Sequence, residues 1–266
     1  MPFALIGFFL ASQKYNFEWV TLLYIVLCMI FARSAAMAFN RYIDRDIDKA
    51  NERTAQLREI PNGTVPVKNV LVFVIINSLL FIGLTFFINP LCFSLSPIAL
   101  IIILGYSFTK RFTSLCHLVL GLGLSLAPIG AYLAACGEFD IIPILFSLVV
   151  LFWVSGFDII YSLQDEEFDK EQKLHSIPVL LGKKNALILS KVLHFITLLI
   201  LSYIGNSADF EKLYWIGFSI FSALLIYQHT LVKHHDLSKI NLAFFTTNGI
   251  ASVIFGAFVI AEILLK

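Results

Sequence analysis

Long apolar runs alternate with short polar stretches along the whole chain of 266 residues. A membrane-spanning α-helix needs about 20 apolar residues, and eight runs come close to or exceed that length. Turn residues at Asn89-Pro90, Gly137-Glu138 and Gly205-Asn206 separate several of them. The pattern therefore predicts a bundle of spanning helices at residues 17–40, 67–88, 91–108, 113–136, 141–163, 185–204, 213–232 and 240–265.

A ninth apolar run, at residues 2–11, has about half the length that a spanning helix needs. It is either a re-entrant piece or the second half of a helix whose start is missing, and we favour the second interpretation. No composition shift marks a domain boundary. The sequence thus predicts an all-α integral membrane bundle of about nine transmembrane helices with a truncated first helix, forming one domain over residues 1–266.

The composition supports a membrane protein. Hydrophobic residues make up 59% of the chain and charged residues only 14%, whereas a soluble domain of this length needs many more polar groups to cover its surface. The net charge is +1, and we expect no nucleic-acid partner. The distribution of the charges is more informative than their sum.

Asn40, Asp44 and Asp48 follow one another at intervals of four residues where the second apolar run ends. Each such interval drifts by only about 40° around an α-helix, so the three side chains share one face. Carboxylate and amide oxygens are the ligands that hard divalent cations prefer. We expect a metal-binding face here, in which Asn40 either supplies an oxygen or holds an aspartate by a hydrogen bond.

The same spacing returns in Tyr161, Asp165 and Asp169, again at the end of an apolar run. A single aspartate there would most simply be a solvated helix end, but two sets with one spacing favour a shared task. We expect the two sets to face each other and to hold a diphosphate between Mg²⁺ ions. Tyr161 would donate to a phosphate or orient a carboxylate.

The basic residues predict the orientation in the membrane. With nine alternating segments, both acidic motifs fall on one side, and 14 of the 19 basic residues fall there with them. Only Lys14, Lys212 and Lys266 fall on the opposite side. We therefore expect a multi-pass protein of the inner membrane with both acidic motifs on the cytoplasmic side.

These motifs resemble those of a known family. Segments 40–48 and 53–63 resemble the first motif of UbiA-type intramembrane prenyltransferases, and segments 158–169 and 173–178 resemble their second motif. Segment 106–111 is similar to the Tyr-x3-Lys-Arg loop of the branch that prenylates 4-hydroxybenzoate. The resemblance covers almost the whole chain, and the short first helix is the one departure from the family pattern.

The resemblance implies an enzyme that transfers a polyprenyl group from a polyprenyl diphosphate to a ring carbon of an aromatic acid. The acid would be 4-hydroxybenzoate, as in ubiquinone biosynthesis, and Mg²⁺ would assist the departure of diphosphate. A dry cavity within the bilayer would protect the allylic cation from water. Substrate contacts would come from the side chains of Arg53, Tyr106, Lys110, Arg111 and Lys173.

Two further residues lie two turns deeper than the motifs. Arg33 precedes Asn40 by seven residues on the same helix face, and an arginine within a span usually faces a cavity or a partner. We expect it to bind the carboxylate of the aromatic acid or a diphosphate oxygen. Asp158 precedes Asp165 by seven residues and would pair with a basic residue or position the acceptor hydroxyl.

Other interpretations remain open at this stage. Relatives that prenylate naphthoates for menaquinone share both motifs, so a naphthoate-type acid is an alternative acceptor. A cation-coupled transporter would instead place its carboxylates near the bilayer midplane and carry an inverted repeat. A purely structural membrane subunit would leave the duplicated spacing unexplained.

Overall fold

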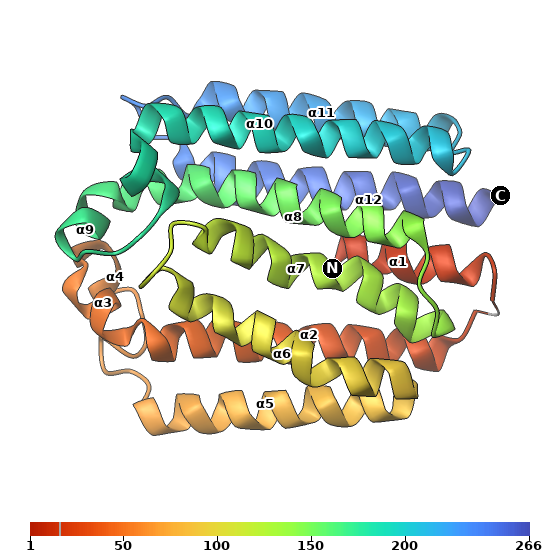
Figure 1. Ribbon diagram of the computed structural model, residues 1–266, viewed down its shortest axis with the longest axis horizontal. Coiled ribbons are helices and arrows are strands. Elements are labelled where there is room, and N and C mark those ends of the chain that lie inside the picture. Colours follow the sequence, from red (N-terminus) through yellow and green to blue (C-terminus); the bar gives the residue numbers. More distant parts are fainter. Residues whose placement is uncertain (16) are drawn as a thin grey trace.

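The computed structural model describes residues 1–15 and 17–266, and it is helical almost throughout (Figure 1). Two short elements, η1 (Leu163–Asp165) and the π-helical η2 (Leu242–Thr247), interrupt the α-helices. The α-helices are α1 (Pro2–Ser12), α2 (Trp19–Ile43), α3 (Arg45–Ala50), α4 (Glu52–Ala55), α5 (Val67–Ile88), α6 (Pro90–Thr109), α7 (Cys116–Cys136), α8 (Ile141–Ser162), α9 (Glu166–Glu171), α10 (Ile177–Ser207), α11 (Lys212–Leu231) and α12 (Asn248–Leu265).

Each predicted apolar segment coincides with a helix in the described part of the chain. Seven of these helices are long and apolar enough to cross a membrane, namely α2, α5, α6, α7, α8 with its continuation, α10, and η2 with α12. The helix α1 is shorter, and α11 is less apolar. The all-α membrane bundle is therefore confirmed, and the count of nine spans stays a prediction.

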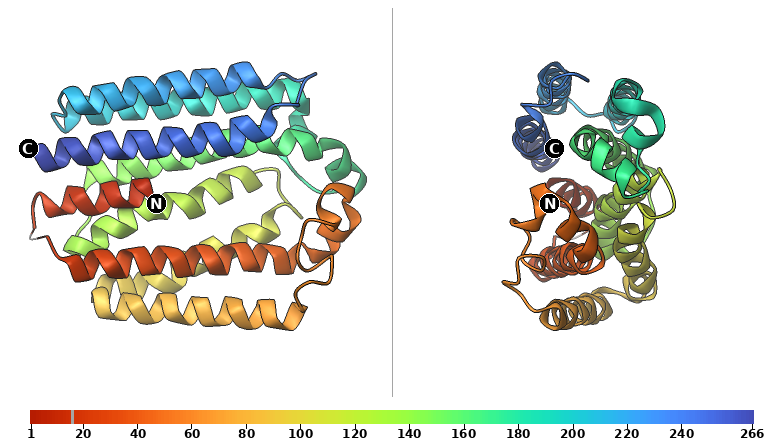
Figure 2. Two further views of the ribbon diagram at one scale, coloured as in Figure 1. Left: turned by 180° about the vertical axis from the view of Figure 1, so that it is seen from behind. Right: turned by 90° about the vertical axis from the view of Figure 1, so that its left-hand side faces the viewer.

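The long helices form two groups of four that the short helix α1 joins. In one group α2 packs against α5 and α6, and α7 packs against α6; in the other α10 packs against α8, and α11 against α12. The helices α7 and α8 make the main contact between the groups, while α1 touches both α7 and α12. Viewed from the end, the helices surround a central region (Figure 2, right). Each group carries one of the acidic motifs.

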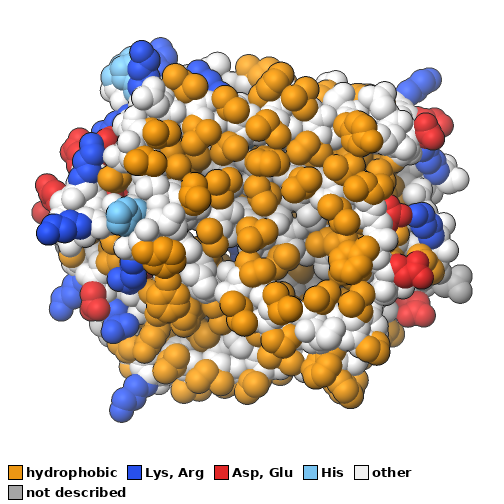
Figure 3. All heavy atoms as spheres, viewed as in Figure 1, with side chains coloured by type: hydrophobic (Ala, Val, Ile, Leu, Met, Phe, Trp, Pro, Cys, Tyr) orange, Lys and Arg blue, Asp and Glu red, His pale blue; other side chains and the backbone are white. Residues whose placement is uncertain are grey.

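The outer surface suits a lipid environment. Apolar side chains cover the middle of the face in Figure 3, and charged side chains gather at its two ends. Phe86, Phe87 and Ile101 are among the large apolar side chains that the fold leaves exposed. Exposure of such a large apolar surface to water is unfavourable, so this surface lies in the hydrocarbon layer of a membrane. The chain is a multi-pass membrane protein.

Two glycines show how the helix ends and contacts arise. Gly137 ends α7 with φ 73°, a left-handed conformation that glycine adopts without strain, as the predicted turn requires. The turn predicted at Gly205-Asn206 is wrong, because α10 continues to Ser207. A Cβ at Gly205 would lie 2.7 Å from the ring of Tyr214, so this glycine serves close packing of α10 on α11.

The first helix is short in the structure as well. It has 11 residues and begins about half way along the bundle (Figure 1). A Cβ on Gly7 would lie 2.0 Å from the carbonyl oxygen of Pro128, so α1 sits directly against the backbone of α7. The prediction of a missing start for this helix stays a prediction.

Candidate active site

The first acidic motif bends where its first aspartate stands. The helix α2 ends at Ile43, and Asp44 joins it to α3 with φ −88° and ψ 5°. The backbone N–H of Asp48 still donates to the carbonyl of Asp44 at 2.7 Å, so the helical register survives the bend. The Nδ2 group of Asn40 donates to Oδ2 of Asp44 at 2.9 Å. Asn40 thus holds an aspartate, one of the two roles expected for it.

The second motif has the same construction. The helix α8 ends at Ser162, and Asp165 closes η1 with φ −102° and ψ 3° before Asp169 follows in α9. The expectation of an uninterrupted helical face is therefore wrong for both motifs. In each, the first aspartate has a ψ near zero, which turns the following residues across the end of the bundle.

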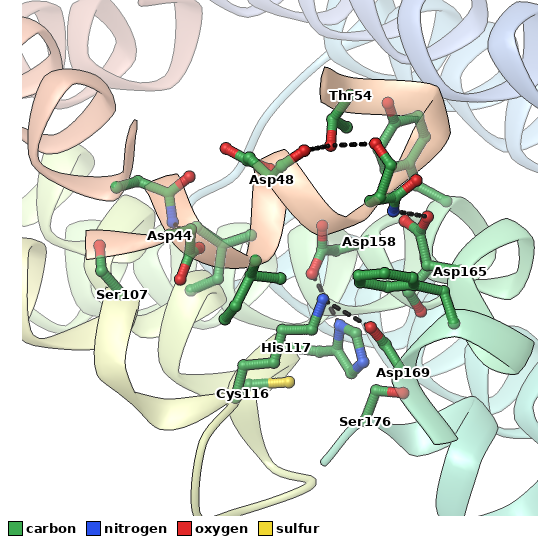
Figure 4. Close-up of a pocket in the computed structure, with 18 of the residues that line it drawn as sticks. Asp44, Asp48, Thr54, Ser107, Cys116, His117, Asp158, Asp165, Asp169 and Ser176 are labelled. Carbon is green, nitrogen blue, oxygen red and sulfur yellow. Dashed lines mark hydrogen bonds and ion pairs between the residues drawn. The ribbon is translucent and has the colours of Figure 1, made fainter. Parts of the chain in front are cut away.

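Both motifs line one cavity of about 260 Å³ at this end of the molecule. Figure 4 shows Asp44 and Asp48 on one side of it, with Asp158, Asp165 and Asp169 on the other. The short helices α3, α4 and α9 lie at the same end (Figure 1). The predicted residues that line the cavity are Asn40, Asp44, Asp48, Arg53, Tyr106, Lys110, Asp158, Tyr161, Asp165 and Asp169.

Basic side chains from other elements pair with three of these carboxylates. The Nη2 group of Arg53 donates to both oxygens of Asp165 at 2.8 and 2.7 Å. The ammonium of Lys110 lies 2.8 Å from Asp169, and Arg111 lies 3.2 Å from Asp44. Although burial opposes the charge of Lys110, the adjacent Asp169 raises the pKa of this ammonium. Lys110 therefore stays charged in the cavity.

Asp48 lies farther from a cation than the other motif carboxylates do. Among the residues that the structure describes, its buried Oδ2 atom has no hydrogen-bond partner, and its nearest cation, Arg58, is 4.0 Å away. Burial, followed by repulsion from Asp44, raises the pKa of Asp48 to about 6. Such an unpaired buried carboxylate oxygen suits a divalent cation, so the donor set of Asn40, Asp44 and Asp48 fits one.

The metal-binding geometry is not fully assembled. In residues 1–15 and 17–266, no three acidic, histidine or cysteine side chains are close enough together to hold a metal ion. In the second motif, Asp165 and Asp169 each pair with a cation within 2.8 Å, whereas in the first motif the cation nearest to Asp48 is 4.0 Å away.

Tyr161 connects the second motif to the last helix. Its hydroxyl accepts a hydrogen bond from Nη1 of Arg53 at 3.3 Å, and its ring stacks on Phe244 of η2 with 4.1 Å between centroids. The ring of Phe244 holds the tyrosine ring in place, and Arg53 holds its hydroxyl. Tyr161 therefore supports the cation that pairs with Asp165.

Comparison with known proteins shows to which family the chain belongs. The model of the UbiA prenyltransferase family matches residues 1–250. This chain belongs to the UbiA prenyltransferase family. It is 31% identical over 240 residues to a 4-hydroxybenzoate octaprenyltransferase of Aeromonas hydrophila, a match over 90% of this chain and 83% of the relative. A protein of the same name from Vesicomyosocius okutanii is 32% identical, with 93% and 89% covered.

Solved structures agree with the fold. The apo structure of a UbiA homologue from Aeropyrum pernix K1 superimposes with a TM-score of 0.88 at 27% identity, over 98% of this chain and 97% of that one. A UbiA homologue from Archaeoglobus fulgidus bound to GPP and Mg²⁺ gives a TM-score of 0.69 at 24% identity, over 99% and 97%. The chain is an enzyme of this prenyltransferase family.

Not every predicted residue reaches the cavity. Arg111 contacts it only through Asp44. Arg33 is exposed on α2 and does not line the cavity. Lys173 is exposed in the turn after α9, with φ 53°, and is also absent from the lining. Their substrate-binding roles stay predictions.

Sequence reasoning also missed residues that the structure places at the site. Asn51 donates to Asp165 at 3.4 Å, and the hydroxyl of Thr54 donates to the carbonyl of Asp48 at 2.8 Å. Both are neighbours of Arg53 in the sequence, which was a usable signal. His117 and Ser176 also line the cavity, but nothing in the spacing of the motifs points to either.

Proposed function

We propose that this protein transfers a polyprenyl group from polyprenyl diphosphate to a ring carbon of an aromatic acid, with 4-hydroxybenzoate as the first candidate. One observation carries the proposal: two acidic motifs from opposite halves of the chain line a single cavity together with Arg53 and Lys110. The relatives named 4-hydroxybenzoate octaprenyltransferase support the choice of acceptor.

The cavity offers a place for the leaving group. The bond between the first prenyl carbon and the diphosphate oxygen breaks, and its electron pair remains on the diphosphate. Arg53, Lys110 and Arg111 already lie within 3.2 Å of a carboxylate and would donate hydrogen bonds to the departing anion. Fixed cations of this kind stabilise charge as it develops and need no reorganisation.

A divalent cation, which we propose is Mg²⁺, would be held by Asp44 and Asp48 with Asn40 behind them, and by Asp165 and Asp169 on the opposite side. When bound, it neutralises charge on the diphosphate. The UbiA homologue that was solved with GPP and Mg²⁺ supports this assignment. The bilayer would take the apolar prenyl tail.

The acceptor would bind on the deeper side of the cavity. Asp158 lies two turns nearer the bundle centre than Asp165 and would accept a hydrogen bond from the acceptor hydroxyl. The ring carbon beside that hydroxyl then attacks the allylic carbon to form the new carbon–carbon bond, and the Asp158 carboxylate, which lines the cavity, would take the ring proton. We propose that Arg33, deeper on α2, attracts the carboxylate of the acid.

We further propose that residues 1–266 act as one domain in the inner membrane, with the cavity on the cytoplasmic side. The excess of basic residues at the motif end supports this orientation. A cysteine introduced at exposed Lys173 should then react with an impermeant maleimide only in inverted vesicles. Labelling in right-side-out vesicles alone would contradict the orientation.

The activity test uses membranes that contain the protein. They are incubated with Mg²⁺, a polyprenyl diphosphate and a panel of acids that includes 4-hydroxybenzoate and a hydroxynaphthoate, and products are identified by mass. The expected product is the prenylated 4-hydroxybenzoate. A naphthoate product alone would retain the reaction and change the acceptor.

The matched control is Asp165→Asn, which keeps the shape of the side chain and removes its charge. Product formation at the wild-type rate in this variant would contradict the proposal, as would intact diphosphate with every acid. Transport is not favoured, because α3 and α9, which carry Asp48 and Asp169, lie at one end of the bundle instead of half way along it (Figure 1).

A further inference from the structure

His117 is a buried polar side chain for which the motifs give no role. It stands in the first turn of α7 with 3% of its surface exposed. Its Nδ1 atom lies 2.7 Å from Oδ2 of Asp158 on α8, and Figure 4 shows the two side chains pointing toward one another. Because His117 is buried and the two atoms are so close, the pair must share a proton in a defined way.

The other ring nitrogen decides where that proton is. The backbone N–H of Ile177 donates to Nε2 of His117 at 3.3 Å. An amide N–H can only donate, so Nε2 must carry a lone pair, and the imidazole proton must be on Nδ1. These two contacts fit a neutral Nδ1–H tautomer of His117 that donates to Asp158. Asp158 is left as an acceptor, with Oδ1 free of protein partners among the described residues.

The backbone around His117 is fixed by close helix packing. One turn later, Gly121 faces α8, and a Cβ there would lie 2.4 Å from Oγ of Ser155. The hydroxyl of Ser155 also donates to the carbonyl of His117 at 3.2 Å. The imidazole therefore has little freedom to leave Asp158.

Through its hydrogen bond with the backbone of Ile177, the same imidazole is also linked to the side of the cavity where the diphosphate would lie. This residue follows Ser176, whose side chain caps α10. The preceding His175 donates its backbone N–H to the carbonyl of Lys110 at 2.8 Å, and Lys110 pairs with Asp169. His117 thus ties the turn that holds Lys110 to the carboxylate deeper in the cavity.

We propose that His117 is a positioning residue for acceptor binding. By its hydrogen bond it orients Asp158 so that Oδ1 faces the hydroxyl of the aromatic acid. Through Ile177 it also fixes the position of Asp158 relative to Lys110, one of the cations that receive the diphosphate. This inference rests on the proposed function. It adds a determinant of acceptor recognition that lies outside both acidic motifs.

Two substitutions separate positioning from packing. In His117→Gln, the amide NH₂ can donate to Asp158 while the amide oxygen accepts from Ile177, so both hydrogen bonds survive. In His117→Met, the volume is similar and both are lost. Small misplacements in an active site cost up to about a hundredfold in rate. We expect His117→Met to lower kcat/KM for the acid by at least about tenfold, with a clearly smaller effect on the KM for prenyl diphosphate.

His117→Gln should restore most of that loss. Equal damage in both variants, or equal damage toward both substrates, would mean that His117 only supports packing, and it would overturn the proposal. Wild-type acceptor kinetics in His117→Met would overturn it as well. Thermal unfolding of each variant, measured in detergent, shows whether the bundle itself is intact.

A spectroscopic test does not depend on turnover. ¹⁵N-histidine labelling should show one histidine as the neutral Nδ1–H tautomer, and its signals should vanish in His117→Gln. A charged ring or the Nε2–H tautomer would overturn the proposal. If wild-type membranes yield no prenylated product but the tautomer is present, the proposed function fails and the acceptor role fails with it, while the hydrogen-bond assignment stands.

Discussion

The two acidic motifs share a backbone design and differ in how their charges are balanced. Asp44 and Asp165 both stand at a helix junction with ψ near zero. In the second motif, Arg53 grips Asp165 with two hydrogen bonds and Lys110 pairs with Asp169. In the first motif, Arg111 pairs with Asp44 at 3.2 Å, but the cation nearest to Asp48, Arg58, is 4.0 Å away.

The difference suggests a division of work between motifs that look alike in sequence. The carboxylates of the second motif hold two cations from other elements, Arg53 of α4 and Lys110 after α6, so this motif is suited to present them to a diphosphate. The first motif has one carboxylate, Asp48, without a cation closer than 4.0 Å, so it gains the most from a metal ion. The spacing of four residues is the same in both, and only the partners distinguish them.

The largest effect should come from the aspartates at the two junctions. Asp44→Asn and Asp165→Asn should each lower kcat by about 1,000-fold, the scale of losing a main electrostatic group in an active site. Initial rates in membranes would measure this, with thermal unfolding as the control for folding. A loss in only one variant would show that one motif alone supports the reaction.

Arg53 tests the second motif. Arg53→Lys keeps the positive charge but loses the planar fork that donates twice to Asp165 and once to Tyr161, so kcat/KM for prenyl diphosphate should fall by about 30-fold. The control is Arg45→Lys, since Arg45 lies 3.8 Å from exposed Asp46. Full activity in Arg53→Lys would show that charge alone is sufficient there.

The pH dependence tests the first motif. Burial raises the pKa of Asp48 to about 6. As the pH falls through 6, a proton therefore competes with the metal ion for this carboxylate. The Mg²⁺ concentration for half-maximal rate should rise by about tenfold between pH 7 and pH 5. A Mg²⁺ requirement that stays constant down to pH 5 would contradict an open metal ligand at Asp48.

The smallest effects concern Arg33 and Lys173, two of the predicted residues that do not line the cavity. Arg33→Ala should raise the KM for the aromatic acid by about fivefold, equivalent to one hydrogen bond of about 1 kcal/mol. Lys173→Ala should change the KM for prenyl diphosphate by less than about twofold, because water and salt screen an exposed charge. An unchanged KM in Arg33→Ala, together with a normal rate, would remove Arg33 from acceptor binding.

The sequence predicted the helices and the meeting of the motifs because both depend on simple periodicities. Apolar runs of spanning length leave few alternatives to helices, and the repeated four-residue spacing marked both acidic sets. The bends at Asp44 and Asp165 could not be predicted, since a junction with a retained hydrogen-bond register leaves no Gly or Pro behind. His117 was missed because its partners, Asp158 and Ile177, are 41 and 60 residues away.

The bends at the junctions also determine the depth in the membrane at which the substrate reacts. The helix α8 has 22 residues before its bend, about 33 Å of helix, which matches the hydrocarbon thickness of a bilayer. The reacting diphosphate would thus stay at the lipid headgroups while its tail stays in the hydrocarbon. Pulling a prenyl chain into water costs about 4 kcal/mol for each five-carbon unit, and an enzyme that bends at this depth avoids that cost for a tail of any length.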